Sequence, residues 1–427
     1  MQEFMPKRWS VFVRVIILFI ASGTVLWGQN DKNQTIYFNI PSKGTGMKSL
    51  IFQQNIDGVA LHEEDTTRHW QLYQEIDGEW VKKKSQIDKR NTTLLYGNYT
   101  DSDQEGEVLK FRWRQEKISE PENVISVQDN GKEIAFIYKD QALVTYRYAL
   151  LPVPEGVSSV YSRGGFIHPL KSFQGNLISR VQPPDHYHHY GLWHPWTRTH
   201  YRGEEIDFWN LIKEEGTVSF HDILSIHTGP LFADLTVVQN HDIHPGRGRQ
   251  TVLKETLTYR LWILPEVEDY YMLDAFYEMS PSTRYPLEIK EYRYQGFSLR
   301  GPAHWSDDNV ALLTSDGKNK SDGNATRARW MKVYGPGDQS DESSVIMMTH
   351  PSNYNYPELI RIWPTGSNGG KENVFLNFNP AQDRDWKMMP GRSYFSKYRM
   401  IIGDRDFSVK ETENLWRIYS GISGDDH

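Results

Sequence analysis

The sequence predicts an all-β protein, an antiparallel β-sandwich with a small β domain at its N-terminus. Short runs of alternating apolar and polar residues, rich in β-branched and aromatic side chains, recur along the chain, and turns rich in Gly, Pro, Asn and Asp separate them. Aromatic residues make up 13% of the chain, which suits β-strands. Convincing amphipathic helices are scarce, and the best candidate covers residues 411–421.

The first element is an export signal, which we expect over residues 1–28. Lys7 and Arg8 precede an apolar run over 15–27, and polar residues follow a cleavage position after Gly28. The run is shorter than the ~20 residues of a membrane span, although an uncleaved anchor remains an alternative. The chain has no cysteine, which for an exported protein favours a bacterial origin. We therefore expect a periplasmic or extracellular protein with no transmembrane domain in its mature chain.

A domain boundary is expected near Ser119–Asn123, where "SEPEN" interrupts the strand pattern. This divides the mature chain into a small β domain, residues 29–122, and a large β-sandwich domain, residues 123–427. In the large domain, residues 133–150 are predicted to form two strands around a Lys139-Asp140 turn. Further strands are predicted at 216–226, 233–243, 254–264, 270–279, 287–300, 344–350, 372–379 and 393–402.

Composition and missing motifs exclude several classes of function. The net charge is -7, and Lys and Arg are not clustered, so the chain lacks the electrostatic footprint of a nucleic-acid-binding protein. The patterns HExxH, GxSxG and GxGxxG do not occur. Without cysteine there is no thiolate chemistry.

The segment "DHYHHYGLWHPW", residues 185–196, holds four of the 15 histidines and two tryptophans. If residues 185–194 are extended, His186 and His188 share one face and His189 points to the other. A pair of histidines on one face predicts two ligands of a divalent metal or, without metal, groups that bind sugar hydroxyls and transfer protons. The alternative is that these rings pack in the core. Candidates for a third ligand are a carboxylate or His200, His221, His241, His244, His304 and His350.

Two carboxylates add to the candidate site. Asp207 lies between Ile206 and Phe208, which predicts partial burial. Glu255 lies on the apolar face of the 254–264 strand, where a carboxylate is costly unless it is paired or its pKa is raised, as in a general acid; exposure at the strand end is the alternative. Four residues of "SLRGPAHW" and "HPSNYNYP" could bind a substrate carboxylate or hydroxyls: Arg300, His304, His350 and Asn353.

These motifs together resemble a bacterial domain family labelled PmoA-like, or methane oxygenase. The family's D-H-x-H-H-x-G-L-W box matches residues 185–193, its D-F-W box matches 207–209, and the resemblance covers about 140–405. The chain departs at Tyr187 and Tyr190, where the family commonly has Pro and Arg. The resemblance implies a sandwich like that of sugar mutarotases and a link to polysaccharide use. It does not imply methane oxidation, because this chain lacks the multiple membrane spans of that enzyme.

The combined features predict an exported carbohydrate-active enzyme that hydrolyses, eliminates or epimerises a glycoside or sugar acid. A non-catalytic glycan-binding protein is the first alternative, and a metal-dependent oxidoreductase is the second. The expected partner is a carbohydrate, and the cofactor is undetermined, with a divalent metal on His186 and His188 as one option. The groups expected to act in the reaction are His186, His188, Glu255 and Asp207. Those expected to contact substrate are Asp185, His189, Trp193, Trp196, Trp209, Arg300, His304, His350 and Asn353.

Overall fold

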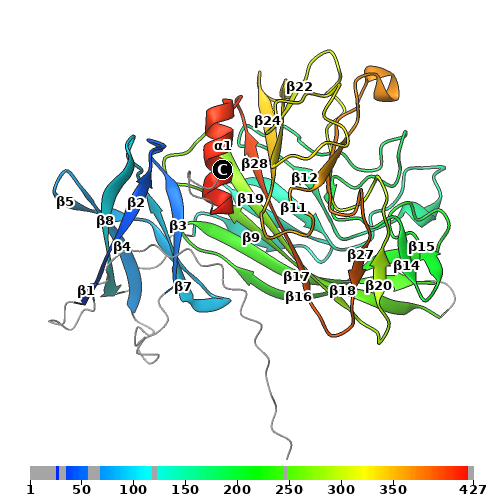
Figure 1. The fold of residues 1–427 in the computed structure, drawn as a ribbon, viewed down its shortest axis with the longest axis horizontal. Coiled ribbons are helices and arrows are strands. Elements are labelled where there is room, and N and C mark those ends of the chain that lie inside the picture. Colours follow the sequence, from blue (N-terminus) through cyan, green and yellow to red (C-terminus); the bar gives the residue numbers. More distant parts are fainter. Residues whose placement is uncertain (1–25, 28–34, 56–67, 118–122, 245–247, 422–427) are drawn as a thin grey trace, which may run out of the picture.

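The computed structural model describes residues 26–27, 35–55, 68–117, 123–244 and 248–421, and nearly all of its regular structure is antiparallel strand (Figure 1). The all-β prediction is therefore confirmed. Most of the predicted signal, residues 1–25 and 28, lies outside the described residues, as do residues 118–122 of the predicted boundary. Among the helices of the described part, none is long and apolar enough to cross a membrane.

The N-terminal region consists of two small antiparallel sheets around their own apolar core, in which Phe38, Phe111 and Trp113 stack. One sheet has the order β1 (Leu26–Trp27), β2 (Thr35–Lys43), β8 (Glu105–Lys117), β4 (Arg68–Ile76), β5 (Glu79–Lys83). The other has the order β3 (Leu50–Asn55), β7 (Asn91–Tyr99), β6 (Ser85–Asp88).

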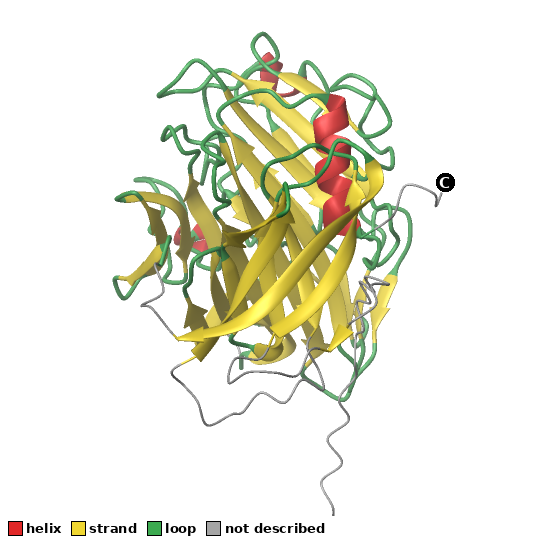
Figure 2. Ribbon diagram, turned by 90° about the vertical axis from the view of Figure 1, so that its left-hand side faces the viewer, coloured by secondary structure: helices red, strands yellow, loops and turns green. Residues whose placement is uncertain are grey.

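The rest of the chain is a sandwich of two eight-stranded sheets, visible as stacked layers in Figure 2. The site sheet has the order β25 (Leu359–Ile362), β26 (Phe375–Asn379), β21 (Phe297–Arg300), β13 (Leu192–Trp193), β12 (Phe166–Leu170), β11 (Gln141–Arg147), β10 (Glu133–Tyr138), β9 (Ser126–Asp129). The back sheet has the order β16 (Gly216–His227), β17 (Phe232–Ile243), β18 (Gln250–Trp262), β19 (Tyr270–Pro281), β28 (Tyr394–Gly403), β24 (Ser343–Thr349), β23 (Trp330–Gly335), β22 (Ala311–Thr314).

Alternation along the strands divides the apolar residues between the two faces of the site sheet. Ile167, Leu192 and Leu376 point inward and share the main core with residues of the back sheet, such as Leu257 and Tyr259. Their chain neighbours Phe166, Trp193 and Phe375 belong to a separate cluster on the outer face. The site sheet therefore has apolar residues on both faces.

A small third sheet lies beside the sandwich, in the order β15 (Glu204–Ile206), β14 (Thr199–Tyr201), β20 (Leu287–Ile289), β27 (Trp386–Met388). It corrects one prediction, because the single run expected over 287–300 is divided between β20 and β21, which belong to different sheets. The Lys139-Asp140 turn is confirmed, with positive φ at both residues. Two short 3-10 helices cover Ser159–Tyr161 and Ser367–Gly370.

The predicted C-terminal helix is confirmed as α1 (Val409–Ser420), which packs against the outer face of the back sheet (Figure 2). Ser408 and Glu411 form a capping box, and Gly421 ends the helix in the left-handed region. Trp416 and Tyr419 are buried on the sheet.

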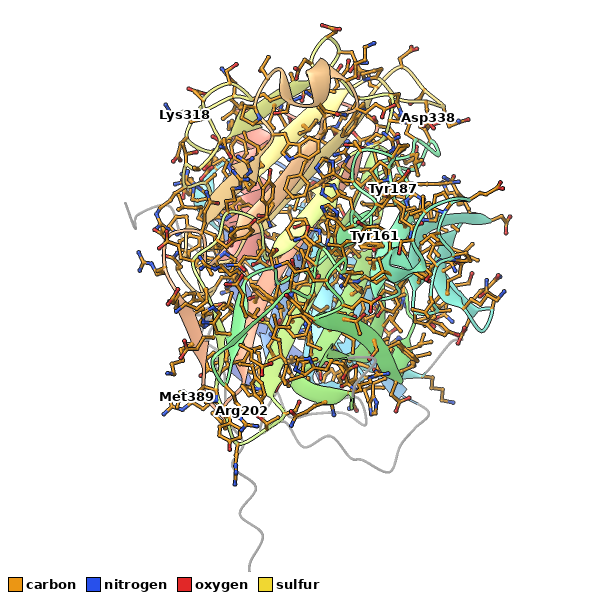
Figure 3. The ribbon with its side chains drawn as sticks, turned by 90° about the vertical axis from the view of Figure 1, so that its right-hand side faces the viewer. Tyr161, Tyr187, Arg202, Lys318, Asp338 and Met389 are labelled. Carbon is orange, nitrogen blue, oxygen red and sulfur yellow. The ribbon has the colours of Figure 1, made fainter. Side chains whose placement is uncertain are left out.

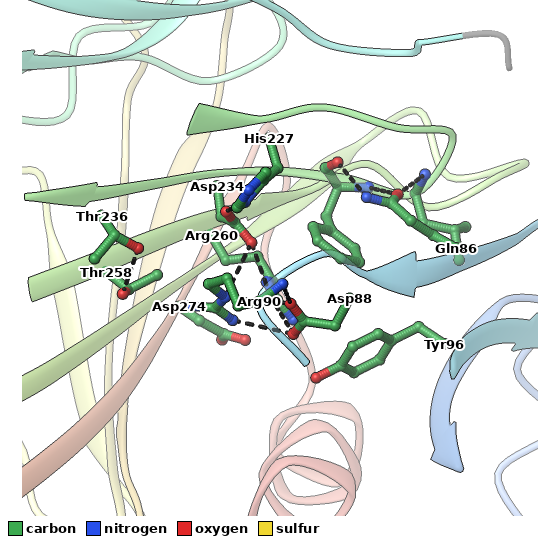
Figure 4. A network of polar contacts seen from close by, with 12 residues as sticks. Gln86, Asp88, Arg90, Tyr96, His227, Asp234, Thr236, Thr258, Arg260 and Asp274 are labelled. Atoms are coloured by element: carbon green, nitrogen blue, oxygen red, sulfur yellow. Dashed lines mark hydrogen bonds and ion pairs between the residues drawn. The ribbon is translucent and has the colours of Figure 1, made fainter. Parts of the chain in front are cut away.

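The N-terminal region contacts the back sheet through a buried ion-pair network (Figure 4). Arg260 Nη2 of β18 donates to Asp88 of β6 at 2.7 Å and to Asp234 of β17 at 2.8 Å. All three side chains are at most 4% exposed. Gln86 adds hydrogen bonds to the backbone of Leu231 and Phe232. Separating the two regions would leave Asp88 without Arg260 as its partner, and unpairing a buried charge is strongly destabilising.

Candidate functional site

The histidine-rich segment forms consecutive turns, so the extended conformation supposed for residues 185–194 does not form. The His186 amide donates to the Pro183 carbonyl at 2.9 Å, and the His189 amide donates to the His186 carbonyl at 3.0 Å. The segment reaches the site sheet only at β13, after Gly191 has turned the chain with a φ of 68°. We call residues 183–191 the histidine turn. Because it is folded, side chains that a strand would separate lie on the same side.

Three imidazoles meet at the histidine turn. The ring centroids of His186 and His189 are 4.7 Å apart, those of His188 and His189 are 5.0 Å apart, and those of His186 and His188 are 5.3 Å apart. One nitrogen of each ring lies within 4.8 Å of the others. His189 is buried, whereas the His186 side chain is 35% exposed. The three rings, called the histidine cluster below, therefore have one side open to solvent.

A carboxylate, that of Asp185, contacts the cluster, and the guanidinium of Arg300 in turn holds this carboxylate. Asp185 Oδ2 lies 2.9 Å from His186 Nδ1 and accepts a hydrogen bond from Arg300 Nη2 at 2.7 Å. Arg300 also donates to the Glu372 carbonyl at 2.7 Å and stacks over Trp363. Burial raises the pKa of Asp185, but the hydrogen bond with His186 and the charge of Arg300 outweigh it, and the net pKa is lowered.

Burial keeps two of the rings neutral. It lowers the pKa of His188 to about 4, and the neighbouring His186 contributes in the same direction. Burial, with His188 and Arg300 nearby, holds the pKa of His189 well below its usual range. Neutral imidazoles can accept a hydrogen bond or donate an electron pair to a metal ion.

An aromatic cluster lies under the rings, and its tryptophans are not exposed. His189 contacts the rings of Trp193, Trp209, Trp363 and Phe375. Trp193 is 0% exposed and Trp209 is 2% exposed, so the expectation that their rings contact a substrate is wrong. Trp196 is also 0% exposed and packs against Trp386 in another core cluster. These tryptophans position the histidine turn, as when Trp209 Nε1 donates to the His188 carbonyl at 2.9 Å.

The accessible aromatic rings at this face are tyrosines. Tyr161 and Tyr187 are partly exposed, with ring centroids 5.9 Å apart (Figure 3). Tyr187 belongs to the histidine turn, and Tyr161 is the last residue of a 3-10 helix. The carbonyl of Tyr161 accepts a hydrogen bond from the Tyr190 hydroxyl at 2.8 Å. Sequence reasoning passed over Tyr161 because nothing near it in the chain points to a site.

Asp207 has a structural role. Its Oδ1 accepts the amides of Trp209 and Asn210 at 2.7 and 2.9 Å, and its Oδ2 accepts the Asn210 side chain at 2.6 Å. Both carboxylate oxygens are thus used in fixing the turn that carries Trp209. We therefore assign Asp207 this structural role in place of the catalytic role expected from the sequence.

Glu255 lies in a second polar group, inside the sandwich. It is 0% exposed, as its place on the apolar face predicted. Its Oε1 is 2.6 Å from His194 Nδ1, and its Oε2 is 2.5 Å from Gln239 Nε2 and 3.3 Å from His241 Nε2. Burial raises the pKa of Glu255, but the two histidines outweigh burial and hold it far below its usual range. Of the two ways to bury this carboxylate, pairing is the one found, and the pKa of Glu255 is lowered and not raised.

The remaining predicted residues lie outside the histidine cluster. His350 and Asn353 contact α1 and Glu358: the His350 ring lies 5.3 Å from that of Tyr419, and Asn353 donates to Glu358 at 3.2 Å. His304 follows β21, and its ring lies against Trp305. The third imidazole is His189, which none of the earlier candidates anticipated. Of the other candidates for a third ligand, three lie within hydrogen-bond distance of a glutamate, namely His200, His241 and His244. His221 is exposed on β16.

A family model described as "Family of unknown function (DUF6807)" matches residues 133–417. This chain belongs to the DUF6807 family. The match includes the whole histidine turn, Arg300 and Glu372, so the candidate site belongs to the family domain and not to the N-terminal region. No curated protein matches the chain.

One similar solved structure is a TPR-domain containing protein from Parabacteroides distasonis ATCC 8503, at 8% sequence identity and a TM-score of 0.21. The comparison covers 90% of this DUF6807 chain and 57% of that chain. A likeness this weak supports no statement about fold or function.

Proposed function

We propose that this DUF6807 protein is an exported enzyme that acts on a glycoside or a sugar acid at the histidine cluster. The observation that carries the proposal is the convergence of three imidazoles, with nitrogens within 4.8 Å of one another, on a face where His186 is 35% exposed. Asp185 orients His186, and Arg300 orients Asp185. Such a chain of fixed polar groups is typical of sites that transfer protons or hold an ion.

The carbohydrate part of the proposal has two supports. Tyr161 and Tyr187 offer apolar ring faces beside polar imidazoles, a combination suited to a ring-shaped ligand that carries hydroxyls. The export signal predicted over residues 1–28 would bring the protein into contact with extracellular glycans. The match of residues 185–193 to the PmoA-like box is consistent with a link to polysaccharide use, and it stays a resemblance.

The structure changes the set of groups assigned to the reaction. His186 and His188 remain, His189 joins them, and Arg300 is retained beside Asp185. Glu255 and Asp207 are left out because protein groups already occupy their carboxylates. Reaction by hydrolysis, elimination or epimerisation is equally compatible with the groups that remain.

The test is product formation from a panel of plant and microbial polysaccharides and oligosaccharides, followed by mass spectrometry. We expect a new sugar product with the wild-type protein and with His221→Ala, an exposed histidine on β16. We expect at least a hundredfold less product with His188→Ala, judged at equal folded concentration. Equal product from His188→Ala and wild type would overturn the assignment of the site.

A glycan-binding protein is the second candidate, favoured by the partly exposed Tyr161–Tyr187 pair. It predicts heat of binding in calorimetry with no product. In that case Tyr187→Ala would abolish binding, while His188→Ala would retain it. The two variants together separate binding from catalysis.

A further inference from the structure

We infer that the histidine cluster is a binding site for one divalent transition-metal ion, with His186, His188 and His189 as its protein ligands. The inference deepens the proposed function and rests on it only for the reaction that a bound ion would serve. Imidazole is a preferred ligand of zinc, copper, iron and nickel ions. Three protein ligands with a fourth position open are the usual arrangement of a catalytic zinc site.

The spacing of the nitrogens is close to what an ion requires. Metal–nitrogen bonds of ~2.0–2.1 Å place the nitrogens of a tetrahedral site ~3.4 Å apart. The three nitrogens here lie within 4.8 Å of one another. Closing the set therefore takes movements of ~1 Å or less, which side-chain torsions in a turn can supply. All three ligands come from four consecutive residues, so the site needs no rearrangement of the sandwich.

The surroundings of two rings match those of metal ligands. A histidine ligand usually gives its second nitrogen to a carboxylate, which fixes the orientation of the ring. Asp185 lies 2.9 Å from His186 Nδ1 and so leaves Nε2 of that ring for an ion. His189 is 2% exposed, and its Nδ1 has no hydrogen-bond partner among the residues that the structure describes. An ion bound by His189 would polarise a ring that the protein otherwise leaves partly unsatisfied.

The charges around the cluster indicate which ligand would take the open position. The carboxylate of Asp185 and the guanidinium of Arg300 form an ion pair and cancel each other in formal charge. A divalent ion on three neutral rings would thus leave the site with a net positive charge. Such a site favours an anionic oxygen, either hydroxide from an acidified water or the carboxylate of a sugar acid.

The experiment is a titration of the full-length protein, stripped of metal with a chelator, with Zn²⁺ in a calorimeter and with Co²⁺ in an absorption spectrometer. We expect one ion per chain and a Co²⁺ spectrum of a four- or five-coordinate nitrogen site. We expect His186→Ala and His188→Ala to weaken binding at least a hundredfold, and Asp185→Asn to weaken it 10- to 100-fold. The controls His200→Ala and His221→Ala, the first partly exposed and the second exposed, should bind as wild type does.

His189→Ala removes a buried ring and can disturb the fold, so the decision rests on His186→Ala, whose ring is partly exposed. Its thermal unfolding without metal should match that of the wild type. The inference is overturned if the stripped wild-type protein binds no stoichiometric ion, or if His186→Ala and His188→Ala both bind as tightly as wild type. Binding is read without substrate, so product formed in excess chelator would overturn the metal's part and leave the proposed enzyme standing. Tight metal binding without product from any glycan would support the metal site and contradict the proposed enzyme.

Discussion

At Glu358, the effect of burial on the carboxylate pKa is larger than the opposing effect of its hydrogen bonds. It is 0% exposed and accepts hydrogen bonds from Thr349, from Asn353 at 3.2 Å and from Tyr398 at 2.9 Å. Burial raises the pKa of Glu358 to about 7, although the three donors oppose it. The protonated form is therefore the one that the fold prefers.

This pKa makes stability depend on pH in a predictable direction. The unfolded pKa is ~4.3, so between pH ~4.3 and 7 the folded state holds a proton that the unfolded state releases. The unfolding free energy of the wild type should fall with rising pH by roughly 4 kcal/mol relative to Glu358→Gln, and stay level above pH ~7. Urea unfolding of both proteins from pH 4 to 8 measures this. Glu278→Gln, an exposed change on β19, serves as the control. Parallel curves for wild type and Glu358→Gln would contradict the prediction.

Residue-level prediction from sequence succeeded for position and failed for role. The alternation of the 254–264 strand correctly placed Glu255 on the inner face. Its lowered pKa depends on His194 and His241, which reach it from β13's end and from β17. Alternation along one strand does not show which side chains from neighbouring strands or from the opposite sheet will contact a residue. An inward carboxylate therefore reads as a candidate acid until its partners are known.

At the scale of elements, Gly191 ends the histidine turn. Its φ is 68°, and a Cβ at this position would lie 2.4 Å from the Ile167 carbonyl oxygen. Gly191→Ala should therefore destabilise the protein by more than the ~1 kcal/mol of an alanine in the left-handed region, and should displace the histidine cluster. Gly203→Ala is the matched control, because Gly203 also has positive φ but no atom within 4 Å of the added Cβ.

Urea unfolding and Co²⁺ binding of the two alanine variants separate backbone conformation from steric contact. Gly203→Ala should lose a little stability and bind Co²⁺ normally, whereas Gly191→Ala should lose more stability and bind weakly. Equal effects of the two changes would show that the contact with Ile167 does not hold the turn.

Strands were predictable at this scale because their signals are local. The β10–β11 hairpin and the long strand β18 follow from alternation and turn residues alone. The histidine turn was not predictable in the same way, because alternation of residue types in 185–194 also describes a strand. Two prolines at 183–184 and Gly191 were the available signals for a turn, since Pro restricts the preceding residue and Gly permits positive φ.

At the scale of the whole molecule, the ion-pair network of Arg260 joins the N-terminal region to the sandwich. Asp88→Ala would leave the buried Arg260 with Asp234 alone, and breaking such a pair costs ~3–5 kcal/mol. We expect a lower urea midpoint for Asp88→Ala. Glu75→Ala, which removes a pair with the exposed Lys110, should cost less than ~1 kcal/mol. A midpoint for Asp88→Ala equal to that of Glu75→Ala would contradict a stabilising junction.

The candidate site depends on contacts that only the whole fold creates. Asp185 meets Arg300, and Arg300 meets Glu372 and Trp363, across segments far apart in the chain. Sequence motifs identified Asp185 and Arg300 separately but could not pair them. Trp363 and Glu372 lack any local signal, because an isolated tryptophan and an isolated glutamate in a loop occur in most proteins.

The strand β13 is only two residues long, yet residues at its end contact two separate polar groups, the histidine cluster and the group around Glu255. Trp193 turns outward beneath the histidine cluster, while the next residue, His194, turns inward to Glu255. Insertion or loss of one residue here would exchange the two directions, burying a bulky indole where the contact between His194 and Glu255 now lies. The register of this one junction therefore fixes both the support of the histidine cluster and the contact between His194 and Glu255.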